Sequence, residues 1–170
     1  MKRIKKTVLT ALCLSLLMMC FSETAYSFEA IYECNEQLLQ KFPNVEAIKN
    51  QFGDGAKWQA RTTPSPHDPD LELRIDGMEY PGIEIHTVGF TLEGEEYFFL
   101  VLVSVEKAGI VDFLGLDVGS AREDVIKKFG SPREIDGNEL IYYDDSEYMV
   151  IVFIIENSNV AGMKLINYLD

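Results

Sequence analysis

The chain has 170 residues, with 15 Lys and Arg against 28 Asp and Glu, and a formal net charge of −13. An acidic excess of this size disfavours binding to nucleic acid and to anionic membrane surfaces. The sequence contains no Gly-rich phosphate loop, no G-x-S-x-G motif and no zinc-type spacing of Cys and His. We therefore expect no cofactor, no metal site and no enzymatic activity.

The first 27 residues are predicted to be a secretory signal. Four basic residues lie within positions 2–6, an apolar run covers 8–21, and small residues at Ala25 and Ser27 suit signal peptidase. Cleavage before Phe28 removes four basic residues and one acidic residue, leaving 11 basic, 27 acidic and a net charge of −16. This predicts a periplasmic or secreted protein. A lipoprotein acylated at Cys20 and an uncleaved anchor are the alternatives.

Two helical segments are predicted at the start of the mature chain. Residues 29–41 place apolar side chains at helical spacing, and residues 44–51 form a second piece that ends at Phe52-Gly53. Cys34 is the one cysteine outside the signal segment, and it lies on the apolar stripe of the first helix. We interpret it as a buried small hydrophobe. A bridge between chains or a reactive thiol is the alternative.

Strands are predicted over residues 71–75, 84–90 and 96–105, where apolar residues alternate or run together. Residues 60–70 are rich in Thr and Pro and predict a loop, and Asp76-Gly77 predicts a turn. Trp58 is the sole tryptophan. It is a candidate either for an interface anchor or for the core.

A short helix is predicted between Ser120 and Pro132. Ser120 is a suitable N-cap with Glu123 three residues later, while Gly130 and Pro132 are stop signals. Strands follow over residues 139–143, 147–155 and 160–168, separated by turns short enough to favour an antiparallel meander.

Two of these strands are apolar on both faces, at residues 97–103 and 147–155. A sheet covered by helices on one side should alternate apolar and polar residues. Either both faces are covered within the monomer, or a partner covers one of them. The candidate interface residues are Trp58, Tyr97, Phe99, Tyr148, Val150, Val152 and Ile154.

Residues 115–143 resemble a pattern of envelope proteins. The matching positions are Gly119, Ser120, Val125, Phe129, Gly130 and Pro132, followed by Tyr142 or Tyr143. The segment is similar to the SmpA/OmlA-type lipoproteins of outer-membrane barrel assembly and to the tandem domains of β-lactamase inhibitor protein. The resemblance covers residues 115–170 well and the earlier half weakly. It implies helices on one side of a curved antiparallel sheet, and protein binding without catalysis.

The expected fold class is α+β, with two layers and short helices packed on one face of a curved antiparallel sheet. Two tandem helix-plus-meander units, 28–109 and 110–170, are expected to form one compact domain. The predicted function is a non-catalytic module that binds a protein partner through an apolar sheet face or its rim, with a homodimer as one form of that partner. The alternative is an envelope protein that binds a small ligand or a cation through its acidic loops.

Overall fold

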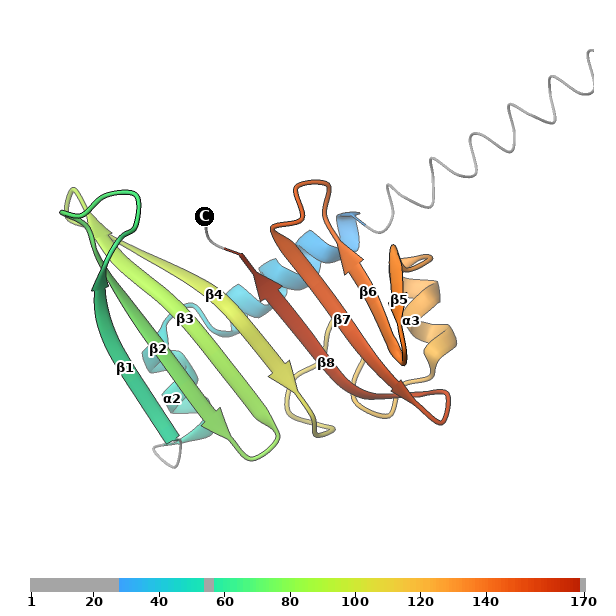
Figure 1. Cartoon of the computed structure of the whole chain (residues 1–170). Helices are drawn as coiled ribbons and strands as arrows, with labels where there is room; N and C mark the ends of the chain where they lie inside the picture. The colour runs from blue at the N-terminus through green and yellow to red at the C-terminus, as the bar shows by residue number, and fades with distance from the viewer. Residues whose placement is uncertain (1–27, 54–56, 169–170) are drawn as a thin grey trace, which may run out of the picture.

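Eight antiparallel strands form one open sheet, and the helices pack on a single face of it (Figure 1). The computed structural model describes residues 28–53 and 57–168. The predicted signal segment, 1–27, lies outside the described residues. The predicted fold class, α+β with short helices on one face of a curved antiparallel sheet, is confirmed.

The strand order is β1-β2-β3-β4-β8-β7-β6-β5, so two four-stranded meanders meet where β4 lies beside β8. The strands of the first meander are β1 (Lys57–Pro64), β2 (Glu72–Tyr80), β3 (Ile83–Leu92) and β4 (Glu95–Val105). Those of the second are β5 (Glu134–Asp136), β6 (Glu139–Tyr143), β7 (Met149–Glu156) and β8 (Asn159–Asn167). The pairing of β4 with β8 covers Leu102–Val105 and Met163–Ile166.

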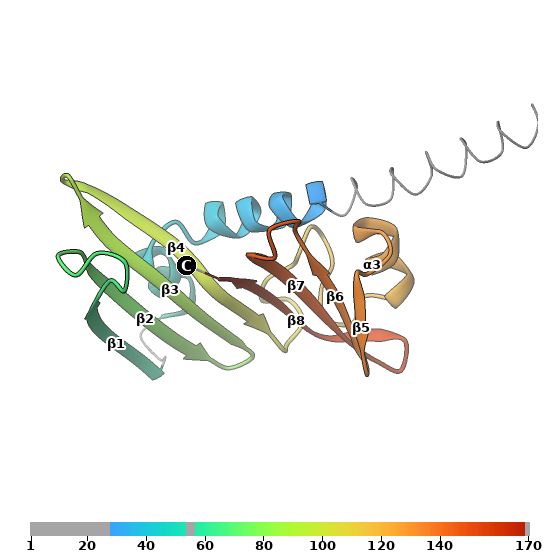
Figure 2. The same cartoon turned by 45° about the horizontal axis from the view of Figure 1, so that its top comes forward.

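Three helical segments cover one face of this sheet (Figure 2). The N-terminal helix, residues 28–41, crosses behind the second meander towards the first. Its apolar stripe, including Cys34, is fully buried, as its spacing predicted. Within the described ranges, no helix has the length and apolar composition needed to cross a bilayer.

Each meander has its own short helix, which packs through aromatic rings. In the first, Phe52 of α2 (Val45–Phe52) lies 5.0 Å from Tyr80, measured between ring centroids. In the second, Phe129 of α3 (Arg122–Phe129) lies 5.4 Å from Tyr142 and 5.1 Å from Phe153. All of these residues except the half-buried Phe52 belong to one continuous buried core.

The start of α3 differs from the sequence prediction. Ala121, not Ser120, is the N-cap, and no side chain caps the helix. The Ser120 hydroxyl instead accepts a hydrogen bond from the Asp117 N–H at 2.9 Å, and its carbonyl accepts from the Val160 N–H at 2.8 Å. Because β8 holds the backbone of Ser120, the cap position moves one residue along. The predicted stop is confirmed, since Gly130 has φ 78° and its N–H donates to the Ile126 carbonyl.

The loop predicted over residues 60–70 is wrong in its first half. β1 continues to Pro64 and pairs with β2 as far as Pro64↔Glu72. β1 lies at an edge of the sheet, where one side of the strand needs no N–H donor, so a proline is tolerated there. The turn predicted at Asp76-Gly77 is also wrong, because both residues lie inside β2 and pair with β1 and β3.

Candidate functional site

The sheet has a second face that no described helix covers, and β7 shows how it arises. Ile151 and Phe153 are fully buried in the core beneath the helices. Successive side chains of a strand point to opposite faces. Val150, Val152 and Ile154 therefore lie on the face without helices, which Figure 1 views from the front. We call it the helix-free face.

Register places further apolar side chains beside these three. Val150 lies between Tyr143 of β6 and Ile166 of β8, and Ile166 in turn lies opposite Leu102 of β4. Val152, with Ile141 of β6 and Lys164 of β8 as its cross-strand neighbours, is only 6% exposed. We call the following residues the apolar patch: Leu102, Ile141, Tyr143, Val150, Val152, Ile154 and Ile166.

Aromatic rings continue the helix-free face onto the first meander. The Phe90 ring stacks against Tyr97 at 5.0 Å and against Phe99 at 5.9 Å between centroids. Tyr97 and Phe99 are 38% and 37% exposed. We call these three residues the aromatic patch.

A bulge corrects one part of the predicted face. The sequence pattern places Val101 and Val103 on the same face as Phe99, but Val103 is fully buried in the core. The register between β3 and β4 shifts between His86 and Thr87, whose partners are Leu102 and Leu100. Val101 is the extra residue of this bulge, so Leu102 takes the place on the helix-free face that alternation had given to Val103.

Two predicted interface residues belong to neither patch. Tyr148, in the turn between β6 and β7, is 45% exposed, and its carbonyl accepts a hydrogen bond from the Tyr168 N–H at 2.8 Å. Trp58 lies on the opposite face, paired with Met78 of the core. Its Nε1–H donates to Asp76 Oδ1 at 3.0 Å, and Lys49 Nζ lies 3.0 Å from its ring centroid. The structure therefore places Trp58 among helix-side contacts, apart from the other six residues.

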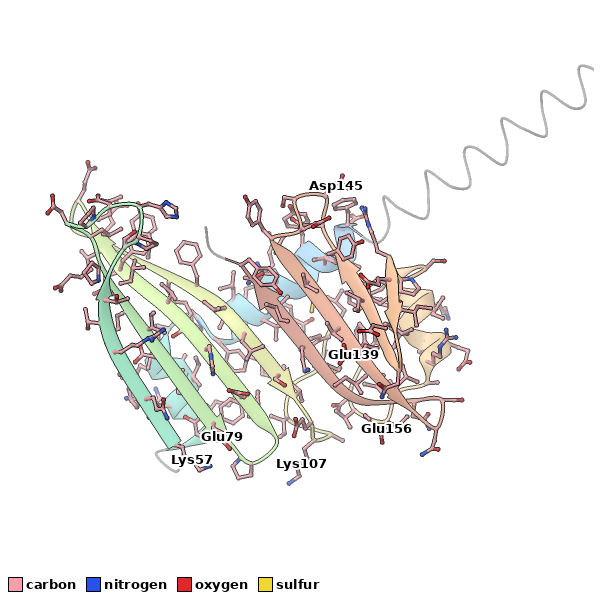
Figure 3. The ribbon with its side chains drawn as sticks, viewed as in Figure 1. Lys57, Glu79, Lys107, Glu139, Asp145 and Glu156 are labelled. Carbon is pink, nitrogen blue, oxygen red and sulfur yellow. The ribbon has the colours of Figure 1, made fainter. Side chains whose placement is uncertain are left out.

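Charged side chains surround the helix-free face (Figure 3). Lys57 forms an ion pair with Glu79 at 3.1 Å at one end of β1 and β2, and Asp145 lies in the turn at the opposite end of the sheet. Within the face, Glu139 lies on β6 and Lys164 pairs with Val152 from β8. The apolar surface thus has charged residues at both ends of the sheet and, at Lys164, within it.

The polar groups that could support other chemistry are engaged with protein partners. Asp144 accepts hydrogen bonds from the Ser146 hydroxyl at 2.6 Å and from the Met149 N–H at 3.1 Å. His86 Nε2 lies 2.8 Å from Glu84 Oε1. Burial raises the pKa of the Cys34 thiol well above its usual range. Across residues 28–53 and 57–168, no three His, Cys, Asp or Glu side chains gather as a metal site would require.

A groove of about 920 Å³ lies on the helix-covered side, beside the start of α2. Arg74, Asp76 and Thr87 are among its lining residues. Asp76 is 2% exposed, and both of its oxygens accept hydrogen bonds from Arg74 or Trp58. The groove therefore has a polar floor whose charges already neutralise each other.

The sequence prediction included five residues of the two patches, namely Tyr97, Phe99, Val150, Val152 and Ile154. It missed the rest, among them Phe90, Ile141 and Ile166. Each of them lies in a predicted strand, and the apolar residues of that strand were the available signal. What the sequence lacked was the order of the strands, which decides which of these residues become neighbours. Comparison of the chain with protein-family models, with curated proteins and with solved structures found no match in any of the three.

Proposed function

We propose that this protein is a non-catalytic binding module that holds a protein partner on its helix-free face. The observation that carries the proposal is that the apolar patch and the aromatic patch lie on a face without a covering layer in the described chain. Burying apolar area is the main favourable term in protein association, and aromatic rings are enriched where that energy concentrates.

Charge indicates the kind of partner. If cleavage occurs before Phe28, the protein has a net charge of −16. A partner with an apolar surface and a basic border would be attracted by this field, which speeds association and disfavours acidic competitors. We therefore propose a basic protein partner, met in the periplasm or outside the cell. A second copy of this chain has the same acidic charge and is the less favoured occupant.

Hydrogen bonds and an ion pair in the turn after β6 argue against the alternative of a cation held by this acidic loop. In the acidic turn after β6, Asp144 accepts hydrogen bonds from Ser146 and Met149, and Asp145 pairs with Arg133 at 2.7 Å. A cation would have to compete with all of these donors.

The test compares one surface variant with a matched control. Phe99→Lys places a charge in the aromatic patch. Ile135→Lys makes the same change at a 58% exposed position of β5 whose cross-strand partner, Leu140, belongs to the helix-covered core. Both proteins, expressed from the complete chain, serve as baits in an envelope extract, and light scattering measures their oligomeric state.

We expect wild type and Ile135→Lys to retain the same basic protein and Phe99→Lys to lose it. Equal retention by all three baits would contradict the proposal. So would a wild-type protein that stays monomeric and retains nothing. A dimer that Phe99→Lys alone dissociates would identify a second copy as the occupant.

A further inference from the structure

β4 is paired on one side along its whole length and on the other side along less than half of it. It pairs with β3 from Glu95 to Val105, but with β8 only at Leu102–Val105 in the described chain. Beyond Leu102 the two strands diverge, as both views show (Figures 1 and 2). Residues 95–101 thus form an edge in the interior of the strand order, which we call the free edge of β4.

Two observations show which backbone groups point to this edge. The Leu100 carbonyl accepts a hydrogen bond from Asn167 Nδ2 of β8 at 2.7 Å, so the backbone of Leu100 points away from β3. The Tyr97 carbonyl points towards β3, where a Cβ on Gly89 would lie 3.3 Å from it. Backbone groups of successive strand residues point alternately to the two sides. The N–H and C=O of Glu96 and Phe98 therefore point to the free edge.

The free edge lacks the Lys and Pro residues that protect other edges, and its two charges, Glu95 and Glu96, stand at one end. Edge strands are ordinarily protected from pairing with another chain because they are short, or because they carry Pro or charged side chains, especially Lys. β5 has three residues, and β1 carries Lys57 and Arg61 and ends at Pro64. The free edge reads E-E-Y-F-F-L-V, with no basic residue and no proline. An uncovered strand of this composition is a template for adding another strand.

We propose that the free edge of β4 receives an extended segment of the protein partner, which adds to the sheet as a strand. The inference rests on the proposed function and names how the partner is held. Backbone hydrogen bonds to Glu96 and Phe98 would supply register, and alternate side chains of the segment would pack on Tyr97 and Phe99.

Charge complementarity indicates that the segment is basic. Glu93 just before β4, Glu95 and Glu96 at its start, and Glu147 in the turn after β6 are all exposed. Lys or Arg at alternate positions of the segment would lie on the same side of the sheet as Glu96 and pair with its carboxylate, while the apolar residues between them would face the aromatic rings on the other side. A segment of about seven residues matches the free edge, since residues pair one to one across a ladder.

The probe is an end-blocked peptide of sequence Lys-Val-Lys-Tyr-Lys-Val-Lys, titrated into the whole protein while amide hydrogen exchange is followed by NMR. In the free protein, we expect the Glu96 and Phe98 amides to exchange much faster than those of Tyr97 and Phe99. With the peptide present, the Glu96 and Phe98 amides should become protected. The control is the same peptide with alternate backbone nitrogens methylated, which cannot complete the ladder.

A pair of variants tests the same edge. Glu96→Pro removes one N–H from the free edge without removing a donor to β3, while Glu96→Val keeps the N–H and removes the same charge. We expect Glu96→Pro to bind the peptide about tenfold more weakly than Glu96→Val, with the two melting temperatures close together. The inference would be overturned if the Glu96 and Phe98 amides are already protected in the free protein, or if the peptide does not bind. It would also be overturned if the peptide binds without changing their exchange, or if the methylated peptide binds equally well.

The peptide experiment can fail without the proposed function being wrong, and the two failures can be told apart. If the peptide arm fails while Phe99→Lys still abolishes partner retention, the partner binds the helix-free face without adding a strand. If Phe99→Lys also retains the partner, both proposals are wrong.

Discussion

A single buried carboxylate organises the polar contacts on the helix side of the first meander. Asp76 accepts from the Trp58 indole at 3.0 Å and from Arg74 Nε at 2.9 Å. Replacing Asp76 by Ala leaves both donors without this acceptor, so we expect a loss of about 2–3 kcal/mol in the free energy of unfolding. Urea denaturation measures it.

The matched control is another Asp that pairs with Arg. Asp145, whose side chain is 79% exposed, lies 2.7 Å from Arg133. Asp145→Ala should cost less than about 1 kcal/mol, because water screens and solvates an exposed pair. Equal losses for the two variants would mean that the Asp76 contacts contribute no more than a surface ion pair.

Tyr142 gives the protein a pH dependence at the alkaline end. Its fully buried hydroxyl donates to the Gly130 carbonyl at 3.1 Å, and burial raises its pKa to about 12. The unfolded chain releases the same proton near pH 10. The contribution of the protonated hydroxyl is therefore complete below about pH 10 and is lost as the pH rises through about 12.

We expect the wild-type free energy of unfolding to fall more steeply across this window than that of Tyr142→Phe. Other groups titrate in the same window, so urea curves of the two proteins are compared at each pH. Parallel pH profiles would show that Tyr142 ionises alike in the folded and unfolded states.

Residue-level predictions succeeded where local spacing decides the outcome. Cys34 is buried because positions 31, 34, 38 and 42 share one side of a helix, which the sequence alone reveals. The role of Trp58 depends on Asp76, 18 positions away, and on Lys49 of α2. Its partners follow from strand register and helix docking, so the sequence left both of its interpretations open.

At the scale of elements, α3 depends on its docking as much as on its sequence. Val125 is fully buried under the helix, which has eight residues and no side-chain cap. Val125→Asp would place an unpaired carboxylate in the core, and we expect a loss of about 3 kcal/mol or more. Lys127→Asp, at an exposed position of the same helix, should change stability by less than about 1 kcal/mol. Thermal unfolding followed by circular dichroism compares the two variants.

Helices and strands with a clear sequence pattern of their own were predictable. Strands that form only because they pair with a neighbouring strand were not. β6 was predicted at residues 139–143, as observed, because its apolar run is bounded by turn residues. The end of β1, residues 60–64, was taken for a loop because Thr and Pro dominate it, yet pairing with β2 as far as Pro64 makes it part of the strand. β5, with three residues, is a strand only because β6 lies beside it.

At the scale of the molecule, the two apolar faces of β7 explain why the sequence could not say which one is covered. Both faces satisfy the same hydrophobic pattern. The choice is made by distant contacts, such as the N-terminal helix and the Phe113 ring, which lies 6.2 Å from Phe153. The candidate site is the face that these contacts leave open.

We expect the two meanders to unfold as one unit. The N-terminal helix spans both meanders (Figure 1), and Leu102–Val105 of β4 pair with β8. Asn167 Nδ2 of β8 also donates to Asn35 Oδ1 at 3.0 Å and to the Leu100 carbonyl at 2.7 Å. A core continuous across this junction should give a single cooperative transition.

Trp58 makes the test direct, because it is the sole tryptophan and lies in the first meander, whereas Val125 packs in the second. If the chain unfolds as one unit, Val125→Asp lowers the urea midpoint of Trp58 fluorescence as much as that of circular dichroism. If the meanders were independent domains, the fluorescence midpoint would stay at its wild-type value while circular dichroism showed two steps. We expect the first result, since separating the meanders would expose apolar side chains of both at the β4–β8 junction, at about 25 cal/mol for each Å².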